Sequence, residues 1–319
     1  MQLSENEGWP MNSVKLGLRN IPAVYVTLLL VVVVNMMMNH RILSENGINN
    51  LAIQMVPTLI AVMAQTCVLL ARELDLSVGS NVGLSTVLMS ATMEKWGLFS
   101  IVIVLVISIL IGMLNGALAV YFKVPGIVIT LATSMIVTGG ALLILPTPGG
   151  YVSLDYARFV LGHHLFVPNT LFILAAVLLC WKYLRMHPWG HSLLATGGNE
   201  YSAYASGLKV QRSKILAFTL SSVLAAIAGM VLAAKTMSGD ANIGTSYTLT
   251  SIAGAVLGGV SFLGGVGSMR KAIAGAVVIV LLVNILFFIG ISSFYQYIFQ
   301  GVILLVSVVV TLRNQNNRH

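Results

Sequence analysis

Long apolar blocks alternate with short polar stretches along almost the whole chain. A helix that crosses a bilayer needs about 20 mostly apolar residues. Two weaker segments, 76–93 and 249–263, are short and rich in glycine and hydroxyl side chains, so each either crosses or re-enters. Eight blocks meet the length requirement with few or no charges: 21–38, 51–70, 98–122, 127–145, 168–184, 215–234, 272–290 and 295–312. The pattern predicts an all-α polytopic membrane protein.

The positions of the basic residues favour crossing by both weak segments. Lys and Arg favour the cytoplasmic side of short loops. Ten crossings with the N-terminus inside leave only four of the 17 Lys and Arg residues outside, namely Arg41, Lys95, Arg158 and Lys235. We therefore expect about ten transmembrane helices with both termini cytoplasmic. The predicted parts are a cytoplasmic segment, one membrane domain and a cytoplasmic tail, which cover 1–20, 21–312 and 313–319.

Composition excludes a soluble protein. The chain is 57% hydrophobic and 8% charged, with a mean hydropathy of +0.93, whereas soluble domains carry roughly 25% charged residues. The net charge of +8 comes from basic residues dispersed singly between apolar blocks. No basic stripe or aromatic-interleaved patch indicates nucleic-acid binding. The lipid bilayer is the expected partner of this surface.

The sequence carries no signature of catalysis. It has no G-x-S-x-G, H-E-x-x-H or C-x-x-C pattern, and no G-x-x-x-x-G-K-[ST] loop that would bind ATP. The histidine pairs His163/His164 and His187/His191 come without a clear third ligand, so no metal site is predicted. We expect a protein without an enzymatic site and without a cofactor of its own.

Residues 72–80 read RELDLSVGS directly after an apolar block. Charges at the membrane boundary are costly unless they are paired or hydrated, which makes them functional candidates. Asp75 and Ser77 are the candidates here. An ordinary turn in which Asp75 or Ser77 caps the next helix fits the same letters.

The long polar loop 185–214 contains the stretch GGNEYSAYASGL. Asn199 can cap a short helix, Glu200 suits its first turn, and Gly207 is placed to end it. Such a helix, presented to the cytoplasm, can dock into the groove of a partner. A plain connecting loop is the alternative, although connecting loops are ordinarily shorter.

Three stretches resemble one family. GGNEYSAYASGL resembles the Gly-x-Asn-x-x-Ala-Ala-x-x-x-Gly-Ile segment of permeases in the ribose/xylose/galactose class of ABC sugar importers. LDLSVGS is similar to that family's I-D-L-S-V-G segment, and IAGAVLGGVSFLGGVGS to its late glycine-rich segment. Departures are Ser202 for an alanine, Leu208 for isoleucine, Tyr204 where the family often has a charge, and Arg72-Glu73 where it more often shows Gly-Gly.

The resemblance implies a permease subunit that imports a monosaccharide, or a related polyol, by alternating access across a bacterial inner membrane. It implies a cytoplasmic ABC ATPase that binds ATP and Mg, a periplasmic or lipid-anchored sugar-binding protein, and a second permease copy or paralogue. The segment that meets the ATPase would consist of Gly198, Asn199, Glu200, Ala203 and Gly207.

Polar side chains within the spans are candidates for the path of the solute. Asn81, Asn115 and Asn284 carry amides that can exchange hydrogen bonds with sugar hydroxyls, and Asp75 and Ser77 lie near the same boundary. Hydrogen bonding between neighbouring helices is the other use of such residues. An ion-coupled secondary transporter or a facilitator is the alternative function, but no span has a central acid or histidine pair for a proton relay.

Overall fold

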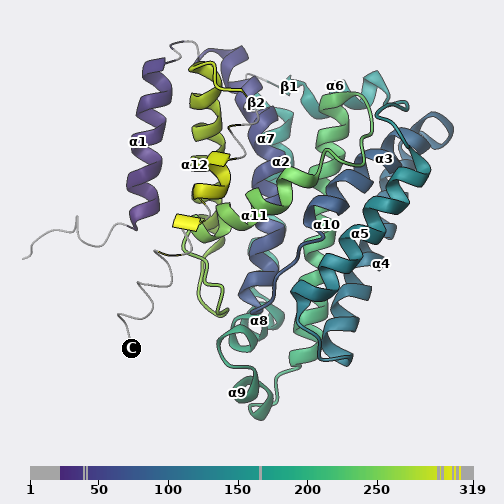
Figure 1. Ribbon diagram of the computed structural model, residues 1–319, viewed down its shortest axis with the longest axis vertical. Coiled ribbons are helices and arrows are strands. Elements are labelled where there is room, and N and C mark those ends of the chain that lie inside the picture. The colour runs from purple at the N-terminus through teal and green to yellow at the C-terminus, as the bar shows by residue number, and fades with distance from the viewer. Residues whose placement is uncertain are drawn as a thin grey trace, which may run out of the picture.

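The protein is described by a computed structural model that is almost entirely helical (Figure 1). It describes residues 22–309 except 39, 41, 165–166, 293–294, 296–297, 304 and 307–308. The long helices are α1 (Ala23–Met38), α2 (Glu45–Leu70), α3 (Val78–Trp96), α4 (Phe99–Tyr121), α5 (Gly126–Ile144), α7 (Asn169–Met186), α10 (Val210–Thr236) and α12 (Met269–Phe288). The expected all-α class is confirmed.

Short elements mark the two ends of the helix bundle (Figure 1). At one end lie α6 (Leu154–Leu161) and a hairpin of β1 (His163–His164) and β2 (Val167–Pro168). At the opposite end lie α8 (Pro188–Gly198) and α9 (Glu200–Ala205). We call these the α6 end and the α8 end.

Six of the described helices are long and apolar enough to cross a membrane: α2, α4, α5, α7, α10 and α12. Helix α1 is apolar but has only 16 residues. The chain is therefore a multi-pass membrane protein, whereas the number of ten crossings stays a prediction. The predicted terminal segments 1–20 and 313–319 lie outside the described residues, as does much of the last predicted span, 295–312.

Helices α2 and α10 form the centre of the bundle. In their most apolar windows, 83% of α2 and 67% of α10 is buried, compared with 28% for α4 and for α5 and 17% for α7. A helix that is apolar on all sides is buried by its neighbours or faces lipid. The outer helices thus leave their apolar faces to the bilayer, and the polar residues of the centre must be satisfied inside the protein.

Small residues allow α4 to lie directly on α10. A Cβ atom added at Gly112 would lie 2.6 Å from the Cα atom of Thr219, and one at Gly116 would lie 2.6 Å from the Cα atom of Ile215. Both distances are shorter than any real contact of a Cβ atom. The four-residue spacing of these glycines is therefore a helix-packing face, as small-xxx-small pairs in membranes usually are.

The segment predicted as a weak span over 249–263 is only partly helical. Helix α11 (Thr245–Leu257) has 13 residues, or about 20 Å at 1.5 Å per residue, which is too short for a core of about 30 Å. Turns over 241–244 precede it, and the Asp240 N–H donates to Thr86 Oγ1 of α3 at 3.0 Å. Gly239 pairs with Gly149, whereas the Gly265 N–H donates to the Leu70 carbonyl at the end of α2 near α8. Helix α11 covers 249–257 of the predicted segment, and turns and loop cover 258–263, so whether this segment crosses the membrane stays a prediction.

Candidate functional site

The helix predicted within GGNEYSAYASGL is present as α9. The Asn199 side-chain oxygen accepts a hydrogen bond from the Ser202 N–H at 2.9 Å, which satisfies one of the free donors of the first turn. Gly207 has a φ of 78° and follows the end of the helix, a conformation that glycine adopts without strain. The predicted cap and stop are confirmed. Ala203 is buried, whereas the rings of Tyr201 and Tyr204 are exposed at 81% and 73%.

Helix α8 brings the late glycine-rich stretch to this segment. A Cβ atom at Gly197 would overlap the Leu70 carbonyl oxygen at the end of α2, and one at Gly265 would lie 2.5 Å from the Cα atom of Gly198. Gly264 in turn contacts Arg72. Two of the three family-like stretches therefore meet at the α8 end of the molecule, beside Leu70 and Arg72, which shortly precede LDLSVGS.

The side chain of Glu200 forms an ion pair with a lysine of the same protein, although it is half exposed. Its Oε2 atom lies 2.8 Å from Lys214 Nζ near the start of α10, and the same Nζ lies 3.0 Å from Glu73 Oε1. The side chains of Lys214 and Glu73 are each only 13% exposed, whereas that of Glu200 is 55% exposed. We call these three residues the Lys214 triad.

Asp75 belongs to a buried polar network in the bundle. Its Oδ1 atom accepts hydrogen bonds from the Ser77 N–H at 2.8 Å and the Ser77 hydroxyl at 2.6 Å, and its Oδ2 atom accepts one from the Ser221 hydroxyl at 2.8 Å. Asp75 is fully buried, and no cation pairs with it among the described residues. The carboxyl thus ties the start of α3 to the middle of α10.

The network extends across two more helices. Asn115 of α4 donates to Ser77 Oγ at 3.1 Å and accepts from the Thr133 hydroxyl of α5 at 2.7 Å. Asn81 donates to Ser222 Oγ at 3.3 Å. Asp75, Ser77, Asn81 and Asn115 are all fully buried. The structure thus brings four of the five predicted path residues together, in a packed network that lines neither of the cavities described next.

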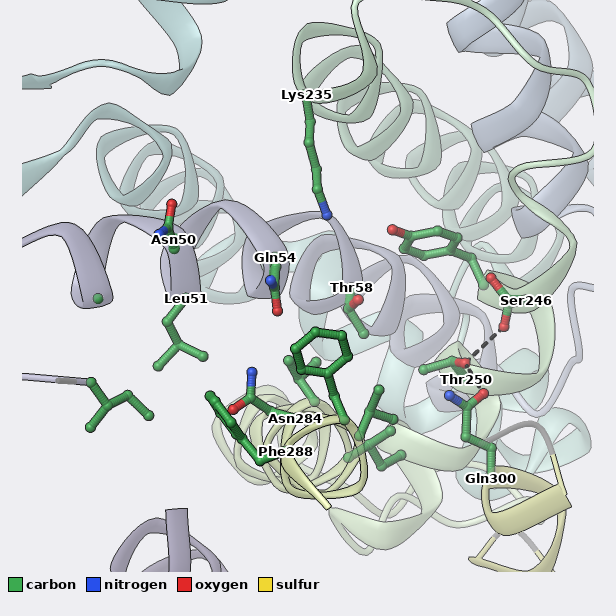
Figure 2. A pocket seen from close by; sticks show the side chains of 17 residues that line it. Asn50, Leu51, Gln54, Thr58, Lys235, Ser246, Thr250, Asn284, Phe288 and Gln300 are labelled. Carbon is green, nitrogen blue, oxygen red and sulfur yellow. Dashed lines mark hydrogen bonds between the residues drawn. The ribbon is translucent and has the colours of Figure 1, made fainter. Parts of the chain in front are cut away.

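The fifth, Asn284, lies on a cavity of about 470 Å³ between α2, α10, α11 and α12 (Figure 2). Figure 2 shows Asn284 and Gln54 facing one another across it, with Lys235 reaching in from the end of α10. Its volume is in the range of about 300–1,000 Å³ that is usual for small-molecule sites. The polar lining residues are Asn50, Gln54, Thr58, Lys235, Ser246, Tyr247, Thr250, Asn284 and Gln300.

The remaining lining of this cavity is apolar, with Phe287 and Phe288 from the last turn of α12. A second cavity of about 630 Å³ shares Lys235, Tyr247 and Gln300 with it and adds Asp240. Mixed amide, hydroxyl and aromatic groups around a space of this size are suited to a small solute with many hydroxyls. Within the described residues, no three His, Cys, Asp or Glu side chains gather as a metal site would need.

The predictions from the sequence missed most of this cavity. Asn50, Gln54 and Thr58 are four residues apart on α2, so they share one helix face. That spacing was readable from the sequence as a polar stripe within an apolar helix. The convergence of Lys235 and Gln300 on the same space was not readable, because it depends on how α10 and the C-terminal part pack.

The comparisons with known proteins agree with one another. The family model described as "Branched-chain amino acid transport system / permease component" matches residues 47–308. The ribose import permease protein RbsC of Haemophilus influenzae is 30% identical over 293 residues, covering 89% of this chain and 91% of the relative. That of Bacillus subtilis is 31% identical over 298 residues, covering 90% and 91%.

A third relative has a different named sugar. The galactose/methyl galactoside import permease protein MglC of Escherichia coli is 28% identical over 310 residues, covering 90% of this chain and 92% of the relative. No solved structure gives a significant match to the chain. The relatives therefore extend over nearly the whole chain, and their names differ in the sugar.

Proposed function

The chain belongs to this family of permease components, and from that premise we propose that it is the membrane subunit of an ATP-driven importer of a monosaccharide. Relatives that match about 90% of the chain carry names of ribose and galactose import permeases. The resemblance of GGNEYSAYASGL, LDLSVGS and the late glycine-rich stretch supports the same function.

The lining of the 470 Å³ cavity favours a sugar over an amino acid, and this observation carries the choice of solute. Its polar groups are amides, hydroxyls and the ammonium of Lys235, and no Asp or Glu lines it among the described residues. An amino acid would leave its own ammonium without an anionic partner, which is costly away from water. A sugar presents uncharged hydroxyl and ring oxygens, and the aromatic lining residues Phe287 and Phe288 suit the apolar side of its ring.

The partners follow from the same proposal. A cytoplasmic ABC ATPase binds ATP and Mg and meets α9, where exposed Tyr201 and Tyr204 stand beside the buried Ala203. A periplasmic or lipid-anchored sugar-binding protein delivers the solute at the α6 end, and a second permease copy or paralogue completes the pathway. The same proposal includes the inner membrane of a bacterium as the location of the chain, with the α8 end in the cytoplasm.

Uptake by the reconstituted complex tests this function. The chain, its co-purifying ATPase and its binding protein are placed in proteoliposomes and offered labelled D-ribose, D-galactose and L-leucine, with and without ATP. We expect ATP-dependent accumulation of a sugar and none of L-leucine. Accumulation of L-leucine alone would overturn the choice of solute, and sugar movement that follows an ion gradient without ATP would favour a secondary transporter.

A further inference from the structure

The Lys214 triad joins the consecutive helices α9 and α10 to a distant turn of the chain and, through it, to α5. Glu200 belongs to α9, Lys214 to the start of α10, and Glu73 to the turn between α2 and α3. The second carboxylate oxygen of Glu73 accepts the N–H of Gly126 at 2.9 Å, which is the first residue of α5. That N–H has no partner within its own helix, and an anion is favoured at this position. An unbroken chain of polar contacts therefore runs from α9 to α5.

The two ion pairs of Lys214 differ in their surroundings. The pair with Glu73 is enclosed, because both side chains are 13% exposed. The pair with Glu200 opens toward the outside, because that carboxylate is 55% exposed. Exposed pairs contribute little and exchange with water easily, whereas breaking an enclosed pair leaves a charge without compensation. The inner pair is the fixed part of the triad, and the outer pair is the part that can open and close.

We propose that Lys214 is the pivot of a relay that transmits movement of α9 to the membrane helices. This inference rests on the proposed function, since an ATPase must move α9. When the outer pair is closed, a displacement of α9 pulls on Lys214 and, through Glu73, on the start of α5. When the outer pair is open, Lys214 remains neutralised by Glu73, so the opening is reversible. Glu200, Lys214 and Glu73 are thus positioning residues for coupling.

The turn that carries Glu73 extends the relay to the centre of the bundle. Two residues later, Asp75 binds Ser77 at the start of α3 and Ser221 of α10. The Leu76 N–H donates to the Thr130 hydroxyl of α5 at 2.9 Å. A shift of Glu73 therefore acts on a turn whose backbone and side chains are bonded to α5 and α10. Movement at α9 has a bonded route to these helices.

The same region provides matched controls. Lys209 and Arg212 precede Lys214 on the same short stretch, are exposed, and form no ion pair within the described part of the chain. Neutralising Arg212 removes one positive charge from the α8 end without touching the triad. Arg212→Gln therefore shows any general effect of losing one local positive charge, as Lys214→Met does, while the triad stays intact.

The ratio of sugar accumulated to ATP hydrolysed by the full complex in proteoliposomes tests the relay, with labelled D-ribose and D-galactose as probes. We expect Glu200→Gln to lower this ratio about fivefold or more, which is the lower end of typical coupling between linked sites, while ATP hydrolysis continues. Arg212→Gln should keep the wild-type ratio. Lys214→Met and Glu73→Gln should lower both the ratio and the yield of folded complex.

Exchanging the charges of positions 200 and 214 tests whether these two residues act through their ion pair. Glu73→Gln combined with Lys214→Glu leaves two acidic groups, at 200 and 214, side by side. Adding Glu200→Lys restores one pair of opposite charges while the amide oxygen at 73 still accepts the Gly126 N–H. We expect the triple variant to recover coupling that the double variant has lost. A triple variant no better than the double, or a wild-type ratio in Glu200→Gln, overturns the relay alone. Wild-type accumulation without ATP overturns the proposed function and the relay with it.

Discussion

The Asp75 network and the Asn284 cavity are both polar regions inside one apolar helix bundle, but they use their polar groups in opposite ways. In the network, side chains that are almost completely buried bind one another at 2.6–3.5 Å across α3, α4, α5 and α10. Around the cavity, amides and an ammonium line about 470 Å³ of space. One buried amide oxygen in each region, Asn81 Oδ1 and Asn284 Oδ1, has no partner within the described chain, so the difference lies in the space that the side chains line.

The difference separates two roles that polar residues have in membrane proteins. Groups that satisfy one another hold helices together, because an unpaired polar group in an apolar interior is costly. Groups that face a space without partners keep their bonding capacity for a solute. We therefore expect substitutions in the network to change stability first, and substitutions around the cavity to change solute recognition first.

The largest effect is expected for Asp75→Leu. The change leaves the Ser77 N–H and the hydroxyls of Ser77 and Ser221 without their acceptor. Each buried donor left without an acceptor costs about 1–3 kcal/mol, so we expect the free energy of unfolding to fall by about 3 kcal/mol or more. Thermal unfolding of the purified protein in detergent measures it. Asp75→Asn is the matched control, because it retains one acceptor oxygen and should lose less; equal losses would contradict the network.

Asn284→Leu tests the other side of the comparison. The side chain lines the cavity, and its oxygen has no partner to lose, so we expect thermal stability within about 1 kcal/mol of the wild type. Loss of a polar contact to the solute should raise the KM for sugar uptake about tenfold, equivalent to about 1.4 kcal/mol. Uptake by proteoliposomes gives the KM. An unchanged KM together with reduced stability would place Asn284 with the structural residues.

A pair of isosteric changes sharpens the comparison at a smaller scale. Thr133→Val removes the hydroxyl that donates to Asn115 Oδ1 at 2.7 Å in the network, with an expected cost of about 1 kcal/mol. Thr58→Val removes a hydroxyl from the cavity lining and should leave stability unchanged while it weakens uptake. Parallel unfolding curves for the two variants decide this. If Thr58→Val is the more destabilising change, the division into buried network and open cavity fails.

The sequence predicted the local parts of this molecule well. Apolar blocks located the helices, and the letters of GGNEYSAYASGL located the cap at Asn199 and the stop at Gly207, which are confirmed. These features depend on residues only a few positions apart, so they are visible in one stretch of chain. The presence of Arg72-Glu73 in place of Gly-Gly was also visible. The ion pair of Glu73 with Lys214 was not, because the two residues are 141 positions apart.

Features that depend on packing were not predictable in the same way. Asn115 lies within the network, whereas Asn284 lines the cavity. This difference depends on the helices packed beside each residue and not on its neighbours in sequence. Likewise, glycines and hydroxyls over 249–263 indicated a weak span but did not reveal that helix α11 ends within it, at Leu257. A role for Asp75, Ser77, Asn81 and Asn115 in the solute path stays a prediction.

The smallest expected effect concerns a buried polar group outside the membrane spans. The Tyr156 hydroxyl of α6 donates to the Met230 carbonyl at 3.1 Å, and burial raises the pKa of this phenol above its usual value. The folded protein then holds the Tyr156 proton at a pH where the unfolded chain, with a pKa of about 10, releases it, so stability should fall as the pH rises above about 10. Tyr156→Phe lacks this component of the pH dependence and loses about 1 kcal/mol at pH 7 with the hydrogen bond. Unfolding curves of both proteins between pH 7 and pH 11 measure the pH dependence of stability and the loss caused by the missing hydrogen bond. If stability falls with pH equally in both proteins above pH 10, the phenol is exposed to water in solution. The α6 end would then not bury its polar group as completely as the bundle buries Asp75.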